Sequence, residues 1–120
     1  MATNKVQDGK TVNYSNSGSA ISAGDVVVIG EQIGVAIVDI ANGATGEVAM
    51  EGVFTVPKVS AAVIAKGESV IYDVSAGEFD DNAATPATGD VSGCCVAWEA
   101  AGNGVTSIAV KLNVGVGTVA

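Results

Sequence analysis

Three groups of residues in this chain have the types and spacing that support chemistry in other proteins. Gly9-Lys10-Thr11 matches the end of a phosphate-binding loop, in which backbone N–H groups and a lysine hold a nucleotide. Glu47 and Glu51 would share one face of a strand, as paired carboxylates share the cleft of a glycoside hydrolase. A polar segment supplies oxygen ligands of the kind that calcium prefers, from Asp80, Asp81, Asn82 and Asp90.

Each group lacks a part that its chemistry requires. The phosphate loop needs a glycine five residues before Gly9, where the chain has Asn4, and it needs a helix after it. The acidic segment lacks the spacing and the final glutamate of an EF-hand. The glutamate pair lacks aromatic sugar platforms, since the five aromatic residues are needed for a core. We therefore predict no catalytic, cofactor-binding or metal-binding site.

The absence of histidine and arginine supports the same conclusion. A protein without histidine has no ordinary proton shuttle near neutral pH, and one without arginine has no bidentate clamp for phosphate. The net charge of −8, with only five lysines, disfavours binding to nucleic acid. We predict that the protein is not an enzyme. Its acidic charge gives a solvated surface or, alternatively, attracts a basic partner.

The two cysteines, Cys94 and Cys95, are adjacent in the sequence. Neighbouring residues of a regular strand point to opposite faces, so these two thiols are poor partners for a disulfide with each other. A zinc site would need further histidine or cysteine ligands, which the chain does not have. We expect both to be buried as small hydrophobic residues; an intersubunit disulfide or a reactive thiol is the alternative.

The composition predicts that β-strands position all of these residues. The chain has 21 valines and one leucine, and valine suits a pleated surface better than a helix. Its 120 residues form one domain. We predict an all-β fold, a small β-barrel or β-sandwich of two similar β units. It has an extended N-terminal arm (1–20), a β domain (21–114), a C-terminal tail (115–120) and at most one short helix (58–66).

Short or alternating apolar runs mark the strands. They predict strands over 26–29, 33–40, 47–56, 70–73, 91–99 and 105–113. The last two runs flank a glycine-rich turn, so we expect them to pair as a hairpin. Trp98 and Phe54 lie in alternating runs, and we expect both to fill the core together with Ile108, Val110 and Leu112.

An internal repeat supports the two similar β units. Residues 21–27 resemble residues 64–70 at an offset of 43, and Gly34, Ala41 and Gly43 match Gly93, Ala100 and Gly102 at an offset of 59. The second unit then carries extra residues, which we expect within 74–92. Chance similarity in a chain rich in glycine, alanine and valine is the alternative.

An ordered series of segments resembles a known family. The segments are ISAGDVVVIG (21–30), IGVA (33–36), GEVAMEGVFTVPK (46–58), AKGESVIYD (65–73), GCCVAWEAAGNG (93–104) and VKLN (110–113). In this order they resemble the DUF2190 family of tailed-phage capsid cement, or decoration, proteins. The similarity covers about residues 21–113, and the Cys94-Cys95 pair departs from the commonest form of the family.

The resemblance implies a structural role on a virus particle. It implies a small β-barrel or β-sandwich that binds the outer surface of a mature phage capsid between capsomers and stabilises it against internal pressure. The implied partner is the major capsid protein, and we expect a homo-oligomer, a trimer rather than a dimer. The alternative is a carbohydrate-binding or adhesin-like module on the virion surface. The chain shows no apolar leader and no membrane span, so we expect synthesis in the host cytoplasm.

The polar N-terminal arm is the expected contact region. It buries too little apolar surface to offset the entropy of ordering, so we expect it to gain order on a partner. An extended arm can add a strand to a capsid edge or to a neighbouring subunit. The candidate residues for capsid or subunit contact are Thr3, Lys5, Val6, Lys10, Val12 and Tyr14.

Overall fold

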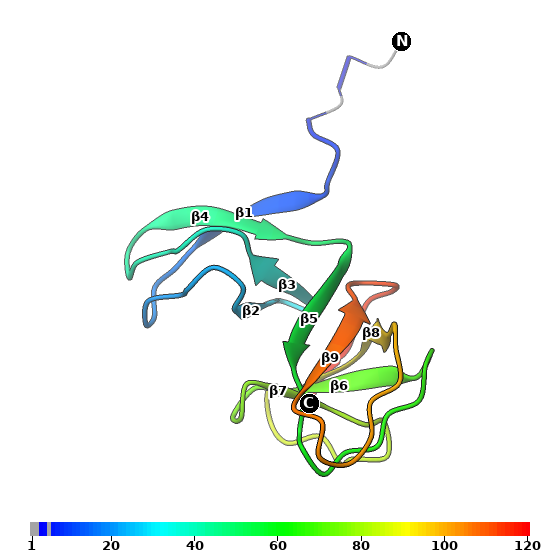
Figure 1. Ribbon diagram of the computed structural model, residues 1–120. Coiled ribbons are helices and arrows are strands. Elements are labelled where there is room, and N and C mark those ends of the chain that lie inside the picture. Colours follow the sequence, from blue (N-terminus) through cyan, green and yellow to red (C-terminus); the bar gives the residue numbers. More distant parts are fainter. Residues whose placement is uncertain (1–2, 5) are drawn as a thin grey trace.

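The valine-rich segments form ten strands in two antiparallel sheets within the part of the chain that the computed structural model describes, residues 3–4 and 6–120 (Figure 1). The first sheet has the order β1-β4-β3-β2, and the second has the order β5-β9-β8-β6-β7 with β10 beside β8. The strands are β1 (Thr11–Ser15), β2 (Val26–Ile29), β3 (Gln32–Ala36), β4 (Thr45–Ala49), β5 (Val53–Pro57), β6 (Ser69–Asp73), β7 (Glu78–Asp80), β8 (Val91–Ala97), β9 (Ser107–Lys111) and β10 (Thr118–Val119). The sheets pack in a sandwich-like arrangement and do not close into a barrel, which confirms the all-β prediction.

Two local predictions differ from the structure. The run 47–56, expected as one strand, is divided between β4 and β5, which belong to different sheets. The chain turns at Gly52, whose φ of +116° is open to glycine and costly for other residues. Residues 58–66 form turns and isolated bridges instead of the helical turns that the sequence allowed. No helix among the described residues is long and apolar enough to cross a membrane.

The two sheets are built from the same unit, as the repeat predicted. In each unit the first strand pairs with the fourth, the fourth with the third and the third with the second. The backbone of Ile21 exchanges two hydrogen bonds with Ile40, and Ile64 does the same with Ala101. The segments 11–49 and 53–111 are therefore two copies of one β unit, which we call unit 1 and unit 2.

The turn before the second strand shows the duplication most closely. Gly24 and Gly67 have φ angles of +95° and +85°, and their N–H groups donate to Ala36 and Ala97 at 2.7 and 2.8 Å. Ala97 thus occupies the place of Ala36 at an offset of 61, so the predicted offset of 59 is wrong by two residues. The extra length of unit 2 lies where the sequence predicted, in β7 and the loop 81–90.

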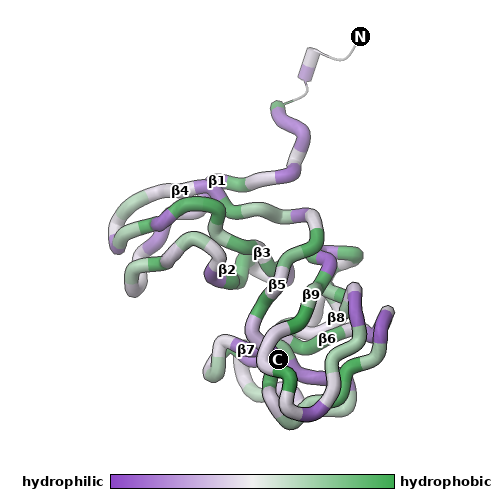
Figure 2. The backbone as a smooth tube through the Cα atoms, in the orientation of Figure 1, coloured by the Kyte–Doolittle hydropathy of each residue, from purple (hydrophilic) through white to green (hydrophobic). Residues whose placement is uncertain are grey.

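Apolar residues form two clusters. The smaller cluster belongs to unit 1 and contains Val27, Ala36, Ile40 and Val48. The main cluster combines unit 2 with one face of β3 and contains Ile33, Val35, Val56, Ala62, Ile64, Val70, Tyr72, Phe79, Val91, Cys94, Cys95, Ala97, Ala101, Ile108, Val110 and Leu112. Figure 2 shows hydrophobic residues along β3 and β9, whereas the segment before β1 is mostly hydrophilic. Strand β3 therefore contributes to both clusters and joins the two units.

An asparagine side chain fixes this junction. Asn113 Oδ1 accepts from the Ile33 N–H at 3.1 Å, and Asn113 Nδ2 donates to the Ile33 and Met50 carbonyls at 2.7 Å each. The amide thus pairs with β3 as another strand would, and it also holds the turn between β4 and β5. The backbone of Asn113 has a φ of +52°, a conformation that asparagine tolerates better than most residues.

A buried polar residue follows the first strand of each unit. In unit 1 it is Asn16, whose amide donates to Ser19 and Ile40 carbonyls at 2.8 and 3.0 Å. In unit 2 it is Lys58, which is 0% exposed. The Lys58 ammonium donates to four carbonyls at 2.8–3.3 Å, those of Val59, Ser60, Gly102 and Val105. These side chains add a second donor to loop carbonyls that already accept from a backbone N–H, among them those of Ile40, Val59, Ser60 and Gly102.

We predict that Lys58→Met destabilises the protein by about 3 kcal/mol or more, because four hydrogen bonds from one charged donor are lost together. Equilibrium urea unfolding measures this change. The exposed Lys66→Met is the matched control, and we expect it to change the stability by no more than about 0.5 kcal/mol. Equal stability of the two variants would contradict the structural role of Lys58.

Candidate interaction surfaces

The residues that suggested nucleotide or calcium chemistry serve other purposes in the structure. Gly9-Lys10-Thr11 leads into strand β1 and not into a helix, and the Lys10 carbonyl accepts from the Met50 N–H. The Asp90 carboxylate is buried and accepts from the Val74 and Ala87 N–H groups. Asp80 and Asp81 accept from backbone N–H groups of their own loop. Among the described residues, no three acidic or cysteine side chains form a group that could hold a metal ion.

The two glutamates are also separated by the fold. Glu47 is exposed on β4, whereas Glu51 lies in the turn that leads to β5. They do not share a strand, because the chain changes sheet between them. The pair therefore has no cleft between two carboxylates of the kind that glycoside hydrolysis uses.

Both cysteines are buried and free, as predicted, but they do not point apart. Their sulfurs lie 3.6 Å from each other. Gly93 has a φ of +88°, and the pairing of β6 with β8 shifts register at Val70 and Ile71, so the alternation of β8 is interrupted. The hydrogen bond between the sulfurs, together with burial, raises the pKa of Cys94, and the same bond lowers the pKa of Cys95.

The predicted contact residues of the N-terminal arm fall into two groups. Thr3, Val6 and Lys10 are exposed, and Val6 is 93% exposed on a segment that extends away from the sheets (Figure 1). Lys5 lies outside the described residues. Val12 and Tyr14 are half-buried, because β1 pairs with β4 and packs them against the smaller cluster. The described part of the arm thus consists of an exposed segment, 6–10, followed by an edge strand.

Trp98 is exposed and does not fill the core, so its predicted burial is wrong. Its side chain is 47% exposed, whereas Phe54 is half-buried against the main cluster. Trp98 directly follows β8, after the last residue whose side chain turns inward. The Lys111 ammonium lies 5.7 Å from the centre of the Trp98 ring, and Trp98 and Lys66 both line a shallow pocket. We call Trp98, Lys66 and Lys111 the tryptophan patch.

The tryptophan patch is unusual in this acidic chain. Of the lysines in the described residues, Lys58 is buried and Lys10 lies before β1, so the patch holds the other two, which are both exposed. The equivalent residue of unit 1 is Ile37, which is 45% exposed. Both units therefore present an apolar side chain at the same turn, and unit 2 adds an aromatic ring with two positive charges.

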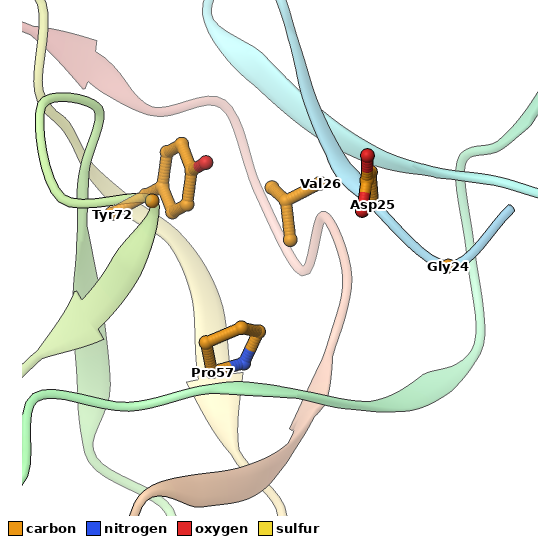
Figure 3. A pocket seen from close by; sticks show the side chains of 6 residues that line it. Gly24, Asp25, Val26, Pro57 and Tyr72 are labelled. Atoms are coloured by element: carbon orange, nitrogen blue, oxygen red, sulfur yellow. The ribbon is translucent and has the colours of Figure 1, made fainter. Parts of the chain in front are cut away.

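A second feature that sequence reasoning missed is a pocket between the two units (Figure 3). It has a volume of about 240 Å³ and is lined by Gly24, Asp25, Val26, Pro57, Tyr72 and Gly77. Its residues come from three separate parts of the chain, so no local pattern could have identified it. For the tryptophan patch the sequence does hold a signal. Trp98 lies shortly before Gly102, at the start of a turn, and a side chain in that position is exposed more often than one within a strand.

The comparisons with known proteins give one match. Residues 6–112 match the family model of phage cement proteins, which confirms the resemblance found in the sequence. No curated protein and no solved structure matches the chain.

We predict that Trp98→Ala lowers the stability by about 1 kcal/mol, because an exposed side chain leaves no large cavity when it is truncated. The matched control is Phe79→Ala, which removes a ring that is 0% exposed and costs about 3–5 kcal/mol. Thermal and urea unfolding of both variants measure the difference. A loss from Trp98→Ala as large as that from Phe79→Ala would place Trp98 in the core after all.

Proposed function

This chain belongs to the phage cement protein family, and from that premise we propose that it binds the outer surface of a mature phage capsid between capsomers and stabilises the shell against internal pressure. Phage cement proteins are structural proteins of the phage capsid, and the family is not a class of enzymes. The family match over residues 6–112 is the observation that carries the proposal.

The construction of the chain supports this role. Cementing requires a stable body and complementary surfaces, and it requires no catalytic group. Weak contacts suffice when many copies act on one lattice, because avidity increases the total hold. The exposed segment 6–10 and the tryptophan patch are the surfaces that we assign to contact with the major capsid protein or with a neighbouring copy.

The N-terminal segment is the part that we expect to reach across a junction. Val6 is an apolar residue with almost no contact to its own chain, and Lys10 carries one of the few positive charges. Among the described residues, no strand pairs with the edge of β1 that does not face β4, so a strand of a partner can add there. We therefore include Thr3, Lys5, Val6, Lys10, Val12 and Tyr14 in the proposed contact region.

We also propose that the protein forms a trimer on the capsid. The junctions of an icosahedral shell have threefold and twofold symmetry, and closed oligomers match such axes. The exposed residues Ile37, Val38 and Trp98 offer apolar area that contact between copies would cover. Chemical crosslinking of decorated particles is expected to give a band of three copies, and a product that stops at one copy would contradict the trimer.

A carbohydrate-binding module is the second candidate, and one observation favours it. Trp98 is an exposed aromatic side chain beside a shallow pocket, which is the kind of platform on which sugars stack. A glycan array separates the two candidates. Binding to a glycan that Trp98→Ala abolishes would support the second candidate, whereas binding only to undecorated capsids supports the first.

We predict that deletion of residues 2–8 leaves the melting temperature unchanged and lowers occupancy on undecorated capsids. The segment lies before β1, so its removal keeps the pairing of β1 with β4. Deletion of residues 2–20 is a poorer test, because it would also remove β1 and uncover the smaller cluster. Co-sedimentation with purified capsids measures the occupancy.

The matched control for the deletion is Glu47→Gln, an exposed change on β4 that we expect to alter neither stability nor occupancy. Full occupancy by the chain without residues 2–8 would remove the N-terminal segment from the contact. Failure of the intact chain to sediment with any capsid preparation would contradict the proposed function itself.

A further inference from the structure

Residues of both units form the walls of the pocket between the units. Gly24 and Asp25, with Val26 at the start of β2, form one wall, and Pro57 at the end of β5 forms the floor. Tyr72 on β6 forms the opposite wall (Figure 3). Its volume of about 240 Å³ lies below the range of about 300–1,000 Å³ that small-molecule sites occupy. The size suits one long side chain of a partner better than a cofactor.

Tyr72 points its hydroxyl into this pocket. The side chain is only 7% exposed, and its ring packs against Phe79 with 5.0 Å between the ring centres. Figure 3 shows the ring directed across the pocket, with the hydroxyl toward Val26 and Asp25. Within the described part of the chain the hydroxyl has no hydrogen-bond partner. No buried side-chain oxygen of the described residues lacks a partner, so the Tyr72 oxygen is open to the water of the pocket, where a ligand can reach it.

The charge at the pocket is negative. Asp25 lies at its mouth and uses Oδ2 to accept from the Ser22 N–H at 2.9 Å, which leaves Oδ1 for another donor. Burial, and then the negative charges of Asp25 and Asp73, raises the pKa of Tyr72. The Ser75 hydroxyl and the Ala76 N–H lower the pKa of Asp73, so that carboxylate stays ionised near neutral pH. Among the described residues, no lysine lines the pocket to neutralise the Asp25 charge.

We propose that this pocket receives a lysine or arginine side chain of a partner protein. The cationic head binds the Asp25 carboxylate, and the methylene stem lies against Val26 and Pro57. The Tyr72 hydroxyl donates to a backbone carbonyl of the same partner segment. The net charge of −8 attracts such a segment from a distance. The partner's identity as the capsid protein, and only that identity, rests on the proposed function.

The chain offers conservative variants for the test. Tyr72→Phe removes only the hydroxyl, and because that group has no internal partner we expect the melting temperature to stay the same. Asp25→Asn keeps an oxygen for the Ser22 N–H and removes the charge. Glu47→Gln is the control with the same change of charge at an exposed position away from the pocket.

The first measurement uses small probes and isotope-labelled protein. N-acetyl-lysine methylamide and N-acetyl-arginine methylamide are titrated while the backbone amide signals are followed by NMR, with N-acetyl-norleucine methylamide as the neutral isostere. We expect the Gly24 and Gly77 signals to shift with the two cationic probes and not with the isostere. Asp25→Asn is expected to weaken the binding about fivefold and Tyr72→Phe about threefold, whereas Glu47→Gln leaves it unchanged.

The second measurement is occupancy of the same variants on undecorated capsids. Loss of occupancy with Asp25→Asn, but not with Glu47→Gln, supports the capsid protein as the source of the side chain. Probe binding without any capsid binding supports the pocket and contradicts the proposed function. Equal shifts with the isostere, or no effect of Asp25→Asn on the cationic probes, would overturn the pocket proposal even if the chain decorates capsids normally.

Discussion

The contact of strand β3 with both apolar clusters is the constraint on which the rest of the structure depends. One face of β3 places Ile33 and Val35 in the main cluster, and Ala36 belongs to the smaller cluster of unit 1. The side chains between β3 and β4 are small, so these two strands must lie close together to leave no gap. Gly34 meets this requirement, since an added Cβ would meet the Val48 side chain and lie 2.9 Å from the Ala49 carbonyl. The Asn113 amide then holds β3 against unit 2.

Comparison of the two units shows which features the fold requires and which exposed features are left for function. Both units keep the glycine turn, the paired bridge and the order of the strands, because these form the hydrogen-bonded frame. The two units differ in the side chains that they expose to solvent. Unit 1 carries the exposed N-terminal segment, and unit 2 has Trp98 with two lysines where unit 1 has Ile37. The pocket with Tyr72 lies between the units, so it depends on their junction and on neither unit alone.

Elements that depend on local physics can be predicted from the sequence. Strand β2 was predicted at its observed bounds, because four apolar residues lie between two glycine turns. Elements at which two local preferences compete differ from their prediction. The alternation of 47–56 continued through Gly52, but the backbone at that glycine turns the chain into the other sheet. The register shift in β8 likewise brought Cys94 and Cys95 together, although regular alternation would have separated them. The alternating run around Trp98 predicts a core position, but β8 ends at Ala97 and leaves the Trp98 side chain exposed. The pocket with Tyr72 could not be predicted, because its walls meet only after the two units pack.

The central claim is that this chain acts through its surfaces as a cement on a phage capsid. A cryo-EM reconstruction of mature particles, prepared with the purified protein in excess, tests that claim most directly. We expect density for both sheets on the outer surface at junctions between capsomers, with the N-terminal segment continuing from β1 into contact with the shell or with a neighbouring copy. A shell that stays bare at saturating protein, or density that never bridges two capsomers, would contradict the account.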